Sequence, residues 1–382
     1  MIYLDNAATT PLSEAALARM LPFLREQYGN ASSLHSLGTA ARRAVDGARA
    51  QVAAALGAQP GEIVFTSGGT EGDNGVLRGV CRRFAAEPVH LVVSCIEHPA
   101  VLAACRALEE DGVRVTYLPV DRLGRVSPDD VSAALSPQTK LVSVMLANNE
   151  VGTIEPVAEI ARRLRGRGVL LHTDAVQAVG HIPVDVRALG VDYLTASAHK
   201  FNGPKGTGIL YQRAGAELPP LAEGGGQEQG RRAGTENVAG IVAAGCALKE
   251  SVAEMPASIR RLEALARLTI ERLRAQIPGL RVNGDPDNRL PGLLSLTFPG
   301  VSGEALMHLL DLKGICVSTG SACAAGRQAP SSVLLALGLT RRQAEGTVRL
   351  SFGRYNTVQE AETAADTLCR LYSTLRRPPG GD

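Results

Sequence analysis

The chain has 382 residues, a formal net charge of +2, seven cysteines and no tryptophan. A chain of this length is usually too long to fold around a single hydrophobic core, which predicts two domains. A nearly balanced charge argues against nucleic acid as an obligate partner, and no apolar run reaches the roughly 18 residues of a membrane helix. The first residues lack signal-peptide features. An odd number of cysteines without CxxC spacing is typical of free thiols, so we expect a cytoplasmic protein.

The apolar pattern predicts alternating helices and strands along the first two thirds of the chain. A predicted helix at 36–56 ends at Gly57, and strands follow near 62–66, 91–95, 113–117, 141–147, 169–172, 191–196 and 208–212. This alternation predicts an α/β fold with a mostly parallel sheet covered on both faces. A polar loop at 221–237 precedes a long predicted helix at 238–274. From residue 280 on, shorter elements predict a smaller α+β domain.

A glycine-containing turn follows the predicted strand at 62–66. Ser67, Gly68, Gly69 and Thr70 lead from that strand into a predicted helix. Two glycines allow backbone amides to approach an anion, and the N-terminus of a helix favours negative charge. An ordinary turn is the alternative, but the order of strand, turn and helix favours a phosphate cradle.

Polar side chains follow two other predicted strands. His98 comes shortly after the strand at 91–95, and Asp174 and Gln177 follow the strand at 169–172. Ligands of open α/β sheets collect outside the carboxyl ends of strands. A carboxylate there could keep a pyridine nitrogen protonated, and Gln177 could donate to a phenolic oxygen. The alternatives are a helix N-cap for Asp174 and an ordinary satisfied histidine for His98; His90 and His181 receive no role.

The run 195–208 carries the strongest chemical signal. Ser197, His199 and Lys200 follow the strand at 191–196, and glycines and a proline then turn the backbone back. A lysine in a confined, partly desolvated site can lose its proton and condense with an aldehyde, which is how enzymes hold pyridoxal phosphate. A solvated surface lysine is the alternative for Lys200 taken alone.

The segment 318–332 has no large apolar side chain, so we expect it to be mobile. It contains Cys323, whose thiolate would be a nucleophile, and Arg327 four residues on would favour that thiolate electrostatically. The other cysteines lie in apolar or helical contexts, which are typical of small buried hydrophobes.

Eight ordered motifs resemble those of cysteine desulfurases, a group of the class-V aminotransferase family in the fold-type-I pyridoxal-phosphate superfamily. The motifs span 3–11, 67–74, 97–101, 148–153, 172–177, 197–208, 232–237 and 318–323. The spacing from Cys323 to Pro330 is similar to that of the extended-cysteine-loop class. Two departures leave the sulfur acceptor open: Ala329 replaces a frequent acidic residue, and few residues follow Leu375, where relatives often have a longer segment that docks a scaffold protein.

The resemblance implies how the cofactor would be held. Lys200 would carry it covalently, His98 would stack on its ring and move protons, and Asp174 would pair with the ring nitrogen. Asn149 and Gln177 would hold the side of the phenolic oxygen. Its phosphate would be bound by Gly69, Thr70, Ser197 and His199, joined by Thr235 from the second subunit of a homodimer.

The resemblance also implies where the substrate would bind. Arg349, with Asn149 beside it, would bind the substrate carboxylate as a bidentate fork, and Arg354 is its nearest rival. Cys323 would accept sulfur as a persulfide. No intrinsic metal is implied, although Cys323 could transiently share an iron–sulfur ligand site with a scaffold.

The implied fold is a fold-type-I enzyme with a large α/β/α domain at 13–255. A smaller α+β domain at 1–12 and 256–382 would carry the cysteine loop. The implied activity converts L-cysteine to L-alanine and supplies sulfur to iron–sulfur cluster assembly or other acceptors. A selenocysteine lyase, or another fold-type-I enzyme such as an aminotransferase, is the alternative, but neither would need Cys323. A non-enzymatic regulator or scaffold could lose His98 or Arg349, and both are present.

Overall fold

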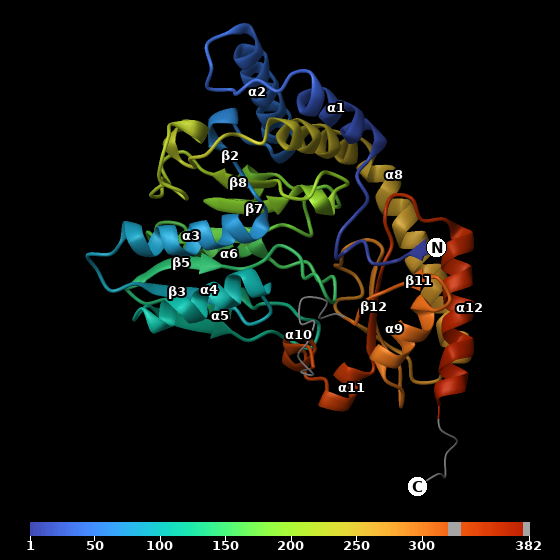
Figure 1. Ribbon diagram of the computed structural model, residues 1–382. Helices are drawn as coiled ribbons and strands as arrows, with labels where there is room; N and C mark the ends of the chain where they lie inside the picture. Colours follow the sequence, from blue (N-terminus) through green and yellow to red (C-terminus); the bar gives the residue numbers. More distant parts are fainter. Residues whose placement is uncertain (320–329, 377–382) are drawn as a thin grey trace.

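A seven-stranded sheet forms the centre of the larger part of the protein (Figure 1). The computed structural model describes residues 1–319 and 330–376. In the order β2-β8-β7-β6-β5-β3-β4, neighbouring strands are parallel except where β8 pairs with β7 and β2. The strands are β2 (Ile63–Thr66), β3 (His90–Ser94), β4 (Arg114–Leu118), β5 (Thr139–Ser143), β6 (Leu170–Asp174), β7 (Tyr193–Ser197) and β8 (Gly208–Gln212). This architecture confirms the predicted α/β fold with a mostly parallel sheet.

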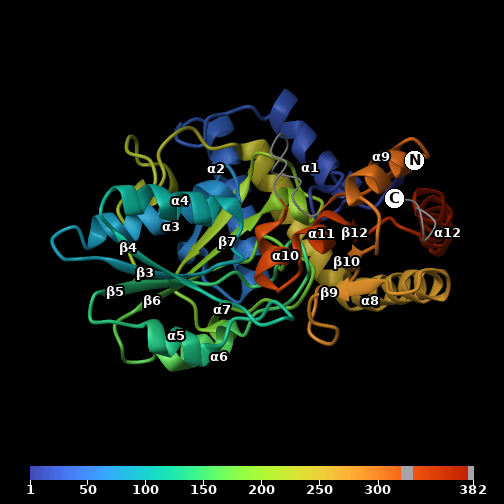
Figure 2. The ribbon, with the colours of Figure 1, turned by 90° about the horizontal axis from the view of Figure 1, so that it is seen from below.

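Helices cover both faces of this sheet (Figure 2). Over one face lie α3 (Gly69–Arg83) and α4 (Pro99–Glu110), and over the other lie α5 (Pro128–Ala134), α6 (Val157–Leu164) and α7 (Val186–Leu189). Because successive side chains of a strand point to opposite faces of the sheet, β2 contributes to the hydrophobic cores on both faces. Val64 packs on the side of α3 and α4, whereas Ile63 and Phe65 pack in the opposite core.

The smaller part is built on a three-stranded antiparallel sheet in the order β12-β10-β9. A short parallel pair joins β1 near the N-terminus to β11. The elements are β1 (Ile2–Tyr3), β9 (Arg281–Asn283), β10 (Leu293–Thr297), α9 (Gly303–Asp311), β11 (Ile315–Cys316), α10 (Ser332–Ala336), α11 (Arg341–Glu345), β12 (Thr347–Ser351) and α12 (Val358–Leu375). Figure 1 places α9 and α12 at the far side from the large sheet.

The long helix α8 (Val238–Gln276) belongs to both parts of the protein. Its first half packs against α1 (Glu14–Arg25) and α2 (Ser36–Leu56) and contributes Leu248 to the large core, whereas Leu262 and Leu273 lie in the small core. Pro256 falls between these halves. This division supports the two domains that we propose: a large domain at 13–255 and a smaller domain formed by 1–12 and 256–382. Within 1–12, Leu4 packs in the small core and Ala7 in the large one.

The predicted elements agree with the observed ones to within a few residues at most ends. The helix at 36–56 ends at Gly57, which has a φ of 68° that favours glycine. The prediction of a strand at 141–147 is wrong at its end, because β5 stops at Ser143. Val144 to Ala147 are buried outside the strand, so burial alone explains their apolar character. Within 1–319 and 330–376, no helix is both long and apolar enough to cross a membrane.

Candidate active site

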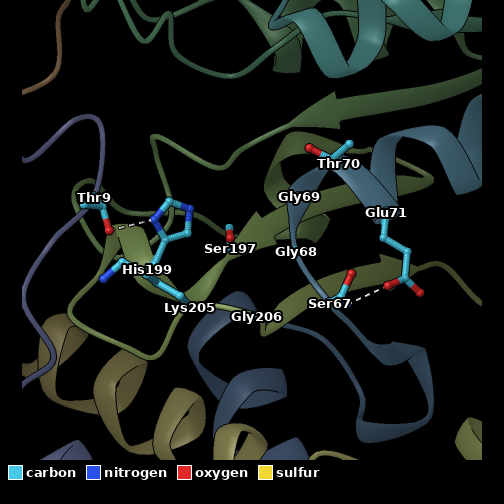
Figure 3. A pocket seen from close by; sticks show the side chains of 10 residues that line it. All are labelled: Thr9, Ser67, Gly68, Gly69, Thr70, Glu71, Ser197, His199, Lys205 and Gly206. Atoms are coloured by element: carbon cyan, nitrogen blue, oxygen red, sulfur yellow. Dashed lines mark hydrogen bonds between the residues drawn. The ribbon is translucent and has the colours of Figure 1, made fainter. Parts of the chain in front are cut away.

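The predicted phosphate cradle opens onto a cavity at the end of the large sheet (Figure 3). The cavity has a volume of about 380 Å³. It is lined by Thr9, Ser67, Gly68, Gly69, Thr70, Glu71, Ser197, His199, Lys205 and Gly206. The four phosphate residues predicted within one chain, Gly69, Thr70, Ser197 and His199, are therefore together. We propose that they bind phosphate at the N-terminus of α3, where backbone N–H groups lack helical partners.

Close packing explains why glycines stand at this turn. A Cβ atom at Gly69 would lie 2.7 Å from Val176 Cγ2, and one at Gly208 would lie 2.6 Å from the backbone of Gly68. Both distances are too short for carbon atoms in contact. The first residue of β8 thus lies against the turn, and a larger residue at position 208 would push β8 away from it, whereas a larger residue at position 69 would displace the side chain of Val176.

His199 is fixed within the cavity by its neighbours. Its Nδ1 lies 3.1 Å from the hydroxyl of Thr9 (Figure 3). Burial, together with the charges of Lys200 and Lys205, lowers the pKa of His199 to about 4. The ring is therefore neutral at pH 7, and it can serve an anion only as an N–H donor.

Lys200 lies in the short helix η2 (Ala198–Lys200), directly after β7. Its Nζ donates to the carbonyl oxygen of Ala7 at 2.5 Å and to that of Ala8 at 2.9 Å. The carbonyl oxygen of Lys200 lies 2.9 Å from Nε2 of His181. The amine is thus held at the end of the sheet by the N-terminal segment, which argues against a solvated surface lysine.

Asp174 is the last residue of β6 and is 5% exposed. Its Oδ1 accepts a hydrogen bond of 2.8 Å from the backbone N–H of Val176, and no helix forms over 175–179. The helix-cap alternative is therefore wrong: the carboxylate holds a turn, and the backbone does not wind into a helix after it. Burial raises the pKa of Asp174, while the charges of His98 and Lys200 lower it. Gln177, also buried, donates from Nε2 to the carbonyl of Ala7 at 2.8 Å.

His98 is the N-cap residue of α4. Its Nδ1 accepts from the backbone N–H of Ala100 at 3.1 Å. Because Nδ1 is the acceptor, the neutral ring carries its proton on Nε2. Burial and the charge of Lys200 lower the pKa of His98, while Asp174 raises it. This tautomer depends on a backbone contact and could not be predicted from residue patterns.

Arg349 lies in β12 and is 2% exposed. Its Nη1 donates to the carbonyl oxygen of Asn149 at 2.9 Å, and its Nη2 donates to Oδ1 of Asp5 at 2.8 Å. Its Nε is buried without a hydrogen-bond partner among the described residues. A buried, unsatisfied guanidinium N–H costs free energy unless a ligand accepts it. Arg349 is therefore suited to bind a carboxylate.

Arg354, the other candidate for the substrate carboxylate, is paired with acidic residues of the chain itself. Arg354 forms ion pairs with Glu250 at 2.8 Å and with Glu254, both on α8. These contacts tie the small sheet region to the long helix. Of the two candidates for a substrate carboxylate, the structure favours Arg349.

Cys323 and Arg327 lie outside the described residues, but both flanks of their segment are described. The backbone of Ser318 exchanges hydrogen bonds of 3.1 and 2.6 Å with Arg349. On the other side, Ser331 donates from its hydroxyl to Glu150 at 2.5 Å. The segment that carries Cys323 therefore leaves and rejoins the described chain beside Arg349 and the loop of Asn149.

Thr235 is exposed and does not line the cavity of its own chain. Its predicted role in the site of a second subunit stays a prediction. Cavity residues that the sequence analysis did not assign include Thr9, Lys205 and Glu71. All three lie within motifs that carried the resemblance (3–11, 67–74 and 197–208), which was the available signal. The two histidines left without a role are both satisfied: His181 contacts Lys200, and His90 contacts the hydroxyls of Thr116 and Thr139.

These groups fit pyridoxal phosphate. The cavity offers hydroxyls, a lysine and unpaired helix N–H groups to a phosphate, and the buried Asp174 carboxylate suits a protonated ring nitrogen. Lys200 follows the neighbouring strand β7, in which Thr195 pairs with Asp174 of β6. The phosphate, the ring nitrogen and the aldehyde of pyridoxal phosphate would each lie near a residue of matching chemistry.

The chain matches the family model described as aminotransferase class-V over residues 2–363. It is 46% identical over 375 residues to cysteine desulfurase IscS of Dictyoglomus turgidum, covering 98% of this chain and 95% of that protein. It is 47% identical over 375 residues to putative cysteine desulfurase IscS 1 of Bacillus subtilis, covering 98% and 99%. Among solved structures, a NifS-like protein superposes with a TM-score of 0.93 at 39% identity, covering 98% of this chain and 100% of that one.

Proposed function

This chain belongs to the aminotransferase class-V family and is a pyridoxal-phosphate-dependent cysteine desulfurase, and we propose that its site residues act on L-cysteine as described below. The observation that carries the assignment of the substrate end is the buried Arg349, whose Nε has no hydrogen-bond partner in the part of the chain that the structure describes. It provides one carboxylate site beside the flanks of the segment that contains Cys323.

The chain's residues would hold the cofactor at three points. Lys200 would bind its aldehyde carbon, Asp174 its ring nitrogen, and the cavity around Gly69 and Ser197 its phosphate. Gln177 and Asn149 would face the phenolic oxygen. When bound, the cofactor supplies an electron sink that makes the α-carbon of an amino acid acidic.

Proton transfer at the substrate would be divided between Lys200 and His98. Arg349 would bind the substrate carboxylate and so fix the direction of the Cα–H bond. We assign removal of the Cα proton to Nζ of Lys200, because Nδ1 of His98 already accepts from Ala100. The Nε2–H of His98 would act as the donor on the ring side.

Cys323 would take the sulfur. Its thiolate would attack the Sγ atom of the substrate, so that an S–S bond forms as the substrate C–S bond breaks. The electron pair of the broken bond, together with a proton, would stay on the carbon skeleton and give L-alanine. Cys323 would retain the sulfur as a persulfide, which balances the reaction without an external oxidant or reductant.

The assembly of the enzyme follows from the same motifs. We infer a cytoplasmic homodimer in which Thr235 of each chain completes the phosphate site of the other. The persulfide would pass to an iron–sulfur scaffold or another sulfur-acceptor protein. The exposed position of Thr235, away from the cavity of its own chain, supports the dimer.

The test is to incubate the purified protein with pyridoxal phosphate and L-cysteine, and to measure alanine and sulfide together in the presence of a thiol reductant. We expect equal amounts of both, and a persulfide on Cys323 when the reductant is omitted. Cys323→Ser should keep the cofactor and lose the persulfide and nearly all alanine formation. Turnover of selenocysteine alone, unaffected by Cys323→Ser, would instead indicate a selenocysteine lyase.

A further inference from the structure

A carboxylate lines the cavity that we assign to the cofactor phosphate. Glu71, in the first turn of α3, is among the lining residues (Figure 3). An unpaired carboxylate in that position would repel a phosphate dianion across a partly desolvated space. Some other group must therefore cancel its charge.

Arg232 is that group. Its Nε donates to Glu71 Oε1 at 2.9 Å, and its Nη2 donates to Oε2 at 3.3 Å. The two side chains are 27% and 23% exposed, so solvent screens the pair only in part. Partial burial opposes ionisation of Glu71, but hydrogen bonds from Arg232 and Ser67 outweigh burial and hold the pKa of Glu71 below its usual value.

Glu71 also holds the phosphate turn itself. Its Oε2 accepts from the backbone N–H of Ser67 at 2.7 Å, across the turn that contains Gly68 and Gly69 (Figure 3). This contact orients Ser67 at the start of the turn. One carboxylate therefore joins the turn to the polar loop at 221–237.

The loop at 221–237 is anchored at a second point. Glu228 is buried and receives two hydrogen bonds of 2.7 Å from Arg49 and one of 2.9 Å from the backbone N–H of Phe65 in β2. Glu228 has a φ of 50° and Gln229 a φ of 61°, in a region that residues other than glycine rarely adopt. Because β2 leads directly into the phosphate turn, the loop braces both ends of that turn.

We propose that Glu71 and Arg232 are a positioning pair for the cofactor phosphate. Arg232 neutralises the charge that Glu71 brings to the cavity, and Glu71 fixes the turn at Ser67–Gly69 against the loop at 221–237. The inference rests on the proposed function, because it takes the cavity to bind the phosphate of pyridoxal phosphate. Substitution of Arg232 should therefore weaken phosphate binding more than substitution of Glu71.

The experiment compares the affinity of the dimeric apoenzyme for pyridoxal phosphate and for pyridoxal, which lacks the phosphate. Arg232→Gln should weaken binding of pyridoxal phosphate about 10-fold or more, because an ionised Glu71 is left facing the phosphate. Glu71→Gln should weaken it no more than about 3-fold. The double variant E71Q/R232Q should return to the level of Glu71→Gln, and pyridoxal affinity should stay unchanged throughout.

Arg82 and Glu223 provide a matched control pair. They also join α3 to the loop at 221–237, at 2.8 Å, but are 52% and 75% exposed and do not line the cavity. R82Q/E223Q should leave both affinities unchanged, and the melting temperatures of all apoenzymes report any folding defect. The proposal fails if the losses in E71Q/R232Q simply add, or if pyridoxal binding falls in parallel. If the variants show the expected pattern of pyridoxal phosphate affinities but the wild-type enzyme has no desulfurase activity, the proposed function alone is refuted.

Discussion

The two ends of the active site are built in different ways. The phosphate end consists largely of one strand, one turn and one helix, β2 to α3, joined by residues at the end of β7. The carboxylate end is assembled from Asp5, Asn149 and Arg349, which come from three segments far apart in the sequence. A local motif can thus specify an anion site through backbone N–H groups, whereas a buried arginine fork needs the tertiary fold to orient it.

The largest expected effect comes from the residue between the two ends. Because we assign to Lys200 both the covalent link to the cofactor and the base at the substrate α-carbon, we expect Lys200→Ala to lower kcat by about 10⁴-fold. Activity is checked by alanine formation. The site of attachment is checked by borohydride reduction of the wild-type enzyme and peptide mapping, which should recover the cofactor on Lys200. Recovery on Lys205, the other lysine of the motif, would move the catalytic centre toward the phosphate end.

The carboxylate end should respond mainly in KM. Arg349→Ala would remove the charge-assisted hydrogen bonds that we propose to the substrate carboxylate, each of about 1.5–3 kcal/mol, so we expect KM for L-cysteine to rise by about 100-fold. The affinity for pyridoxal phosphate should change little, since Arg349 does not line the phosphate cavity. Equal losses in cofactor and substrate affinity would show that the two ends are not separable.

Arg354 is the control for this variant. It lies on the same stretch of chain but pairs with Glu250 and Glu254 of α8. Arg354→Ala should lower the free energy of unfolding by about 1 kcal/mol or less and leave KM within about twofold of wild type. A large rise in KM for Arg354→Ala, with Arg349→Ala unaffected, would exchange the two assignments.

The phosphate end could be predicted from the sequence better than the carboxylate end, because most of it is built from residues that are close together along the chain. The order of strand, turn and helix predicted the turn with Gly69 and Thr70, the resemblance to cysteine desulfurases added Ser197 and His199, and the structure brings all four to one cavity. The choice of Arg349 over Arg354 rested on the resemblance alone, because residue patterns do not show the partners of the two arginines at positions 5, 149, 250 and 254. Such patterns also missed the carbonyls of Ala7 and Ala8 that hold Lys200, since a backbone acceptor leaves no mark in them.

His98 should give the reaction a distinct dependence on pH. Burial lowers the pKa of His98 below its ordinary value, so the ring is neutral above that lowered pKa and becomes protonated as the pH falls through it. Protonation at Nδ1 would break the contact with Ala100 and place a cation beside Lys200. We expect kcat/KM to be flat near neutral pH and to fall on the acid side.

The matched variant is His98→Gln, which should lower kcat by about 100-fold and remove that acid-side decline. The measurement is kcat/KM for alanine formation between pH 5 and 9, with cofactor occupancy followed by absorbance at each pH. An unchanged acid limb in His98→Gln would assign the titration to another group and leave His98 with a stacking role only.

The smallest effect that we predict tests whether the contacts around Arg349 orient it. Asp5→Ala removes the acceptor of Nη2, so the fork loses one of its two fixed contacts, and KM for L-cysteine should rise about 5-fold, which corresponds to about 1 kcal/mol. Asp5→Asn retains an acceptor oxygen in the same place and should stay within about twofold of wild type. If Asp5 acted mainly by repelling the substrate carboxylate, both variants would lower KM. At the phosphate end, Arg232 neutralises the carboxylate of Glu71, so no such competing charge is left there. The affinity for pyridoxal phosphate should therefore be the same in both Asp5 variants as in the wild type.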